Sequence, residues 1–135
     1  MTDSTNRLKE ELEHRVLLID SATGTMIQQY TLAEDDFRGE RFRDHGCNLQ
    51  GNNDLLVCTR PDIVAEIHRS NLEAGADIIE TNTFNATSIS QADYATEHLV
   101  HEINLSAARI ARECADEFSR STPQRPRFVA GVLGP

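Results

Sequence analysis

The chain has 135 residues, enough for one ordinary domain, and its 13 Lys and Arg residues against 22 Asp and Glu residues give a formal net charge of −9. This acidity argues against nucleic acid and membrane surfaces as partners, because both attract clustered basic residues. No apolar run approaches the roughly 20 residues that span a bilayer, and the polar N-terminus lacks the apolar segment of a secretory signal. With three widely spaced cysteines, these features predict a cytoplasmic protein.

Hydrophobic spacing and turn residues divide the chain into alternating strands and helices. Pro61 suits the first turn of a helix, and Gly75 suits its end. The predicted elements, in chain order, are a surface helix (3–14), a buried strand (16–20), the start of a helix (26–30), an ordered excursion (31–58), a helix (59–75), a strand (76–81), a short helix from residue 88, a long amphipathic helix (97–118) and a strand (127–134).

The order strand, helix, strand, helix, strand is typical of α/β folds with parallel strands. Each strand-plus-helix unit is long enough for a right-handed crossover between parallel strands. The pattern fits either a doubly wound sheet or part of a (β/α)8 barrel. In both architectures ligands bind at the carboxyl ends of the strands, so the residues there form the candidate site.

Small polar residues follow the predicted strands, in the segments DSATGT, ETNTFN and GVLGP. Asp20 could bind a substrate ammonium. The small residues after it, beginning with Ser21, would let backbone N–H groups approach a ligand carboxylate. The two features together suit a zwitterion such as an amino acid. The alternative is that Asp20 only caps the turn or the following helix.

The second predicted strand ends in a run of hydroxyl and amide side chains. Thr81, Asn82, Thr83 and Asn85 offer hydrogen bonds to a polar ligand. Threonine and asparagine also favour turns, so a purely structural role is the alternative. Glu80, the last residue of the strand, either lines the pocket or pairs with a buried cation.

The cysteines and histidines form no recognisable constellation. Cys114 lies on the apolar stripe of its helix, which predicts a place in the core. Cys47 and Cys58 lie in the polar excursion and form no C-x-x-C pair, so no metal site is predicted from them. The histidines on predicted helices, His68 among them, have no partner pattern and are predicted on the solvated surface.

Five segments are specific in combination: LLIDSATGTMIQ, DFRGERF, GNNDLL, EAGADIIETNTFNAT and RFVAGVLGP. Together they closely resemble the N-terminal homocysteine-binding domain of the cobalamin-dependent methionine synthases. The likeness covers nearly the whole chain, from about Leu8 to Pro135. It implies a truncated (β/α)8 barrel, with residues 1–14 as a helical lead-in and residues 15–135 as the first three β/α units, its strands parallel.

The resemblance also implies an activity for the full-length protein. Family members transfer a methyl group from methylcobalamin to homocysteine, giving methionine, and further domains of the same chain bind cobalamin and folate. Zinc held by three cysteines binds the homocysteine sulfur and favours its thiolate. Those cysteines lie near later strands, so this fragment is expected to bind neither zinc nor cobalamin and to hold no catalytic residue.

The family's first-strand motif is matched in part. Asp20, Gly24 and Thr25 agree with it, whereas Ser21 stands where the family usually has glycine, the residue that best allows a close backbone approach. The segment Glu80 to Phe84 matches without departure. The predicted substrate-binding residues are Asp20, Ser21, Glu80, Thr81, Asn82, Thr83 and Asn85.

Two functional hypotheses follow. In the first, the chain is the N-terminal piece of a methionine synthase and is inactive by itself. In the second, it is a non-catalytic fragment or a small-molecule-binding α/β module. A phosphohydrolase-like α/β enzyme is less favoured, because Gly24 follows Asp20 by one residue too many and no lysine follows. Nucleotide-binding glycine motifs are also missing from the sequence.

Overall fold

The computed structural model describes residues 2–20 and 22–134, so the predicted site residue Ser21 lies outside the described residues. The helices are α1 (Thr2–His14), α2 (Thr23–Gln28), α3 (Glu34–Arg38), α4 (Leu56–Thr59), α5 (Pro61–Glu73), α6 (Ser88–Ala92) and α7 (Val100–Ser121), with 3₁₀ turns η1 (Asn53–Leu55) and η2 (Glu97–Leu99). The strands are β1 (Ile78–Glu80) and β2 (Phe128–Ala130). Within these ranges, no helix is long and apolar enough to cross a membrane.

β1 and β2 form a small parallel sheet in which Ile78 lies opposite Phe128. The predicted buried strand 16–20 is wrong in extent and in burial: only a single parallel bridge forms, between Ile19 and Ile78, and Val16, Leu18 and Ile19 are exposed. That segment lies at the edge of the sheet, and the backbone N–H of Asp20 donates to the Ile78 carbonyl at 2.9 Å. The α/β class with parallel strands is confirmed. The number of β/α units stays a prediction.

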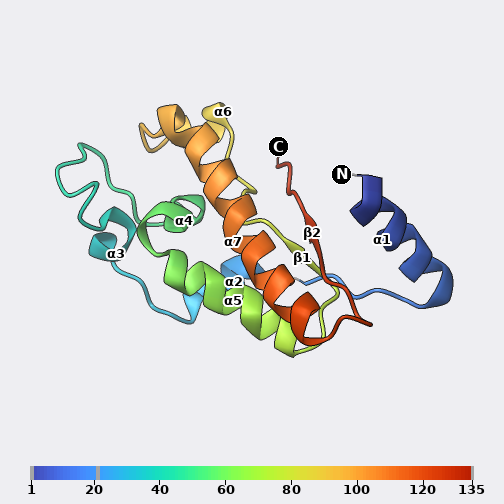
Figure 1. Ribbon diagram of the computed structural model, residues 1–135. Helices are drawn as coiled ribbons and strands as arrows, with labels where there is room; N and C mark the ends of the chain where they lie inside the picture. The colour runs from blue at the N-terminus through green and yellow to red at the C-terminus, as the bar shows by residue number, and fades with distance from the viewer. Residues whose placement is uncertain (1, 21, 135) are drawn as a thin grey trace.

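The two main helices form where the sequence predicts them. α5 begins at Pro61, which lacks an N–H that would have no intrahelical partner there. Gly75 follows the end of α5 with a φ of 110°, a left-handed conformation that favours glycine. α5 and α7 pack against each other, and both contact β1 (Figure 1). In the same view α1 lies apart from this helix pair, beyond β2.

The predicted excursion 31–58 is ordered and partly helical. It contains α3, η1 and α4, which its aperiodic sequence did not indicate. Phe37, Leu55 and Leu56 from this segment are buried in a core shared with α5 and α7. Helices this short are unstable in isolation, so tertiary packing rather than local propensity forms them.

Cys114 and His68 test which helix side chains are buried and which are exposed. Cys114 is buried on α7, as predicted. His68 is fully buried on α5, so its predicted place on the surface is wrong. Neither ring nitrogen has a hydrogen-bond partner among the described residues. Burial lowers the pKa of His68 from 6.5 to about 4, so the ring is neutral at pH 7.

Replacing His68 with leucine should raise the free energy of unfolding by about 1 kcal/mol at pH 7, because it removes a buried polar group that makes no hydrogen bond to the described residues. The His68 ring binds a proton below about pH 6.5 in the unfolded chain but only below about pH 4 in the folded chain. The wild type therefore loses stability as the pH falls from 6.5 to 4. The advantage of the variant should therefore be larger at pH 5 than at pH 7. Urea denaturation measures both values, and the exposed His98→Leu is the matched control. A destabilised His68→Leu chain would contradict this assignment.

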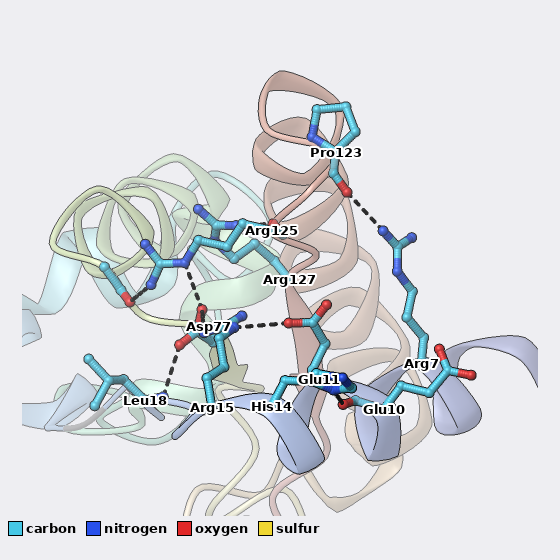
Figure 2. A network of polar contacts seen from close by, with 11 residues as sticks. Arg7, Glu10, Glu11, His14, Arg15, Leu18, Asp77, Pro123, Arg125 and Arg127 are labelled. Atoms are coloured by element: carbon cyan, nitrogen blue, oxygen red, sulfur yellow. Dashed lines mark hydrogen bonds and ion pairs between the residues drawn. The ribbon is translucent and has the colours of Figure 1, made fainter.

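Asp77 joins the amino-terminal ends of the parallel segments (Figure 2). Its Oδ1 accepts from Arg15 Nη1 at 3.0 Å and from Arg125 Nε at 2.9 Å. Its Oδ2 accepts from the backbone N–H of Leu18 at 3.0 Å. Burial by itself raises the pKa of Asp77, but these hydrogen bonds outweigh it, and the pKa lies below its usual value. We call this group the Asp77 clamp.

Candidate functional site

The carboxyl ends of the parallel segments are connected by short hydrogen bonds. Asp20 Oδ1 accepts from the backbone N–H of Glu80 at 2.9 Å. Thr81 Oγ1 accepts from the backbone N–H of Val132 at 3.0 Å. Thr83 Oγ1 donates to the Val132 carbonyl at 2.9 Å. The carboxyl ends of the three parallel segments, which the sequence predicts to share one site, therefore lie next to one another.

A pocket of about 260 Å³ opens where these ends meet, and we call it the strand-end pocket. Its described lining residues are Ala22, Thr23, Gly24, Asn53, Asp54, Glu80, Thr81, Asn82, Thr83, Phe84, Asn85 and Val132. Pockets for drug-sized ligands typically enclose roughly 300–1,000 Å³, so this one suits a compact ligand.

Most predicted site residues lie at this pocket. The lining includes Glu80, Thr81, Asn82, Thr83 and Asn85. Asp20 is adjacent through its bond to Glu80 but is not among the described lining side chains, and Ser21 lies outside the described residues. The role of all these residues in substrate binding stays a prediction.

Asp20 does not cap the following helix. The N-cap of α2 is Ala22, with a left-handed φ of 57° and no side-chain cap hydrogen bond. Asp20 is only 6% exposed, and its Oδ2 is buried without a hydrogen-bond partner in the described part of the chain. A buried carboxylate oxygen in this state is stabilised by a cation or a hydrogen-bond donor from beyond the described residues.

Several polar side chains of the pocket already have partners within the protein. Asn82 Nδ2 donates to the Asn53 carbonyl at 2.8 Å. The hydroxyls of Thr81 and Thr83 lie 2.7 Å apart. These bonds fix the loop after β1, so turn formation and pocket lining, which the sequence presents as alternatives, coexist here.

Sequence reasoning missed Asn53 and Asp54 as lining residues. They belong to GNNDLL, a segment whose polar pair before an apolar run was a usable signal. The turn is held by a buried amide pair: Asn52 Nδ2 donates to Gln91 Oε1 at 2.9 Å and Gln91 Nε2 donates to Asn52 Oδ1 at 3.1 Å. Gln91 Nε2 also donates to the Asn85 carbonyl at 3.1 Å, which couples the turn to the loop after β1.

The pocket is electrostatically acidic. Burial raises the pKa of Asp54 to about 6, although the backbone N–H of Asn85 counteracts this. Burial also raises the pKa of Asp20 to about 6; the N–H of Glu80 lowers it and the Glu80 charge raises it. Within the described lining no lysine, arginine or histidine offsets these carboxyl groups. Such a pocket favours a ligand that carries a positive group.

The acidic and sulfur-bearing side chains do not gather into a metal site within the described part of the chain. No group of three or more histidine, cysteine, aspartate or glutamate side chains among the described residues could hold a metal ion. Cys47 is exposed, Cys58 is half-buried and Cys114 is in the core, so the cysteines do not come together. The residues described here do not fit a zinc centre.

The fold and the pocket together define an α/β domain with a compact acidic ligand site at the ends of parallel strands. Residues 17–135 match the family model of homocysteine S-methyltransferase. The chain therefore belongs to the homocysteine S-methyltransferase family. The match begins just before Asp20 and includes every described residue of the strand-end pocket.

Solved structures share the fold. The metallated form of the homocysteine methyltransferase MmuM from Escherichia coli is 22% identical, with a TM-score of 0.71 over 95% of this chain and 41% of that one. The oxidised form of the same enzyme is 23% identical, with a TM-score of 0.69 over 92% of this chain and 39% of that one. The chain thus spans about two fifths of the length of the structures it matches.

Proposed function

We propose that the chain is the N-terminal part of the homocysteine-binding barrel of a cobalamin-dependent methionine synthase. Family membership supports methyl transfer to homocysteine, and the five segments quoted above support methionine synthase within the family. The observation that carries the proposal is the acidic strand-end pocket. Beside it, Asp20 keeps one buried carboxylate oxygen without a partner among the residues described.

The chemistry of homocysteine suits this pocket. Its ammonium complements the carboxyl groups of Asp20, Asp54 and Glu80, because a charge-assisted hydrogen bond is strongest to an ionised acceptor. Its carboxylate suits the backbone N–H groups that follow Asp20. The chain's own part in the proposed reaction is to bind and orient the amino-acid end of the substrate.

Activation of the homocysteine thiol and supply of the methyl group are assigned to parts of the proposed enzyme outside these 135 residues. In the proposed enzyme, zinc would favour the homocysteine thiolate and methylcobalamin would supply the methyl group. The described residues provide no set of ligands for either of these groups. Residues 1–14 would be a lead-in and residues 15–135 the first three β/α units of a (β/α)8 barrel. The partners would be the cobalamin and folate domains of the same cytoplasmic protein.

A non-catalytic fragment or small-molecule-binding module is the second candidate for the 135 residues by themselves. The chain covers 41% of the metallated relative, and the residues described contain no metal-binding group. A phosphohydrolase is disfavoured, because the described lining of the pocket lacks the basic side chains that bind phosphate esters.

Asp20→Asn tests the proposal in the complete methionine synthase that it implies. The amide keeps an acceptor for the Glu80 N–H but loses the charge. We expect the KM for homocysteine to rise at least about tenfold, the equivalent of about 1.4 kcal/mol. Initial rates against homocysteine concentration measure this effect.

The exposed Asp93→Asn is the matched control and should leave the KM unchanged. An Asp20→Asn enzyme with the wild-type homocysteine dependence would refute the assignment of Asp20. The 135-residue chain assayed alone separates the two candidates, since methyl transfer by it would rule out the non-catalytic one.

A further inference from the structure

A basic groove lies at the opposite end of β2 from the strand-end pocket. It has a volume of about 380 Å³ and is bounded by α1, α7 and the residues just before β2. The polar residues in the described lining of this basic groove are Ser4, Arg7, Arg112, Asp116, Ser119 and Arg127. Among the described lining residues, three guanidinium groups thus accompany one carboxylate, in a chain whose net charge is −9.

Arg127 is the central residue of the groove. Its side chain is only 6% exposed, and its Nε is buried with no hydrogen-bond partner among the described residues. Nη1 donates to the Arg125 carbonyl, which carries no full charge. Burial and the charges of Arg125 and Arg15 lower the pKa of Arg127, and the Asp77 charge offsets them only in part, so the site disfavours the cation unless a further anion is bound.

The carboxylate of Asp77, whose charge acts on Arg127, pairs with other groups. Both oxygens of Asp77 accept hydrogen bonds inside the Asp77 clamp, from Arg15 and Arg125 at Oδ1 and from the Leu18 N–H at Oδ2. Figure 2 shows Arg127 beside this group without a bond to Asp77. The clamp therefore leaves Arg127 without an anionic partner in the part of the chain that the structure describes.

The other groove residues are placed to assist Arg127. Arg112 Nη2 donates to Asp116 Oδ1 at 2.8 Å and to the Arg127 carbonyl at 3.3 Å, while its buried Nε has no partner within the described chain. Ser119 Oγ accepts from the Arg127 backbone N–H at 2.8 Å, which fixes the backbone at this point. Asp116 is thus already used by Arg112, and the groove keeps an excess of positive charge.

We propose that the basic groove is an oxyanion-binding site in which Arg127 and Arg112 hold a phosphate or carboxylate group. A planar guanidinium offers two parallel N–H donors, which match the paired oxygens of such a group. The Nε–H groups of both arginines are buried and lack partners in the described part of the chain, so an anion that binds the guanidinium groups in the groove would reach them after a small side-chain movement. The site lies at the amino-terminal end of β2 and does not depend on the homocysteine proposal.

Inorganic phosphate is the first probe, titrated into the 135-residue chain at constant ionic strength. The arginine Nε–Hε NMR signals of Arg127 and Arg112 should shift and saturate. Arg127→Gln and Arg112→Gln should each weaken phosphate binding at least about tenfold. The Arg112 side chain is 41% exposed, so we expect Arg112→Gln to fold normally. This variant therefore still tests the site if the loss of the buried Arg127 impairs folding.

Arg43→Gln is the control, because it removes the same charge from an exposed position outside the groove. It should change the affinity by less than about twofold. Acetate forms a second arm: shifts with phosphate alone assign a phosphate group, and shifts with both assign a general oxyanion site that a carboxylate side chain could fill. Non-saturating shifts, or equal weakening in Arg43→Gln, would overturn the proposal.

Discussion

Asparagine in place of Asp77 should lower the free energy of unfolding by about 3 kcal/mol at pH 7. The side chain is 1% exposed and accepts from Arg15, Arg125 and the Leu18 N–H, and the neutral amide cannot balance two cations. Breaking a buried ion pair typically costs about 3–5 kcal/mol. We expect the lower end because Arg15 and Arg125 are 32% and 40% exposed and regain water. Urea denaturation followed by circular dichroism gives the value.

Glu117→Gln provides the matched control. Glu117 accepts from Arg69 at 3.0 Å, but both side chains are about half exposed. Exposed pairs contribute at most about 1 kcal/mol, because water and salt screen them. Equal losses in the two variants would show that the Asp77 clamp is no stronger than a surface ion pair.

The Asp54→Asn variant should become more stable relative to the wild type as the pH rises. Burial raises the pKa of Asp54 from 3.8 to about 6 in the folded chain, so folding favours the protonated form. The stability from this site is complete below pH 3.8 and is lost as the pH rises through about 6. Between pH 4.5 and 7.5 the wild type should lose about 2 kcal/mol that the variant, which cannot titrate, keeps.

Asp77→Asn supplies the contrasting titration. The pKa of Asp77 is lowered, so its stabilisation is present above 3.8 and is lost as the pH falls through the lower folded value. The difference between this variant and the wild type should stay constant from pH 7.5 to 4.5 and shrink only in stronger acid. Unfolding free energies of the three chains across this range test both directions, and a constant difference for Asp54→Asn would refute the burial effect.

The location of the site could be predicted from the sequence because it follows from topology. Apolar runs that end in polar residues indicate strand ends, and parallel strands bring those ends to one edge. Thr81, Thr83 and Asn85 were placed at the pocket by this argument alone. Helices α5 and α7 followed from Pro61, Gly75 and a regular apolar stripe.

The remaining features depend on contacts that span long stretches of the chain. Asp54 reaches the pocket because the Asn52–Gln91 pair, 39 residues apart, folds its turn against the next loop. His68 is buried because α5 contacts α2, α4, α7 and β1, an environment that helix periodicity alone does not reveal. Arg127 Nε has no partner in the described chain because Asp77 pairs with Arg15 and Arg125 instead, and no local pattern encodes this choice.

The parallel segments are fastened separately at their two ends. The Asp77 clamp secures the base, whereas the bonds from Thr81 and Thr83 to Val132 secure the rim beside the pocket. Replacements in the rim loops can therefore alter recognition without loosening the base. The hydrogen bonds of the base thus stay in place when the side chains around the pocket are exchanged.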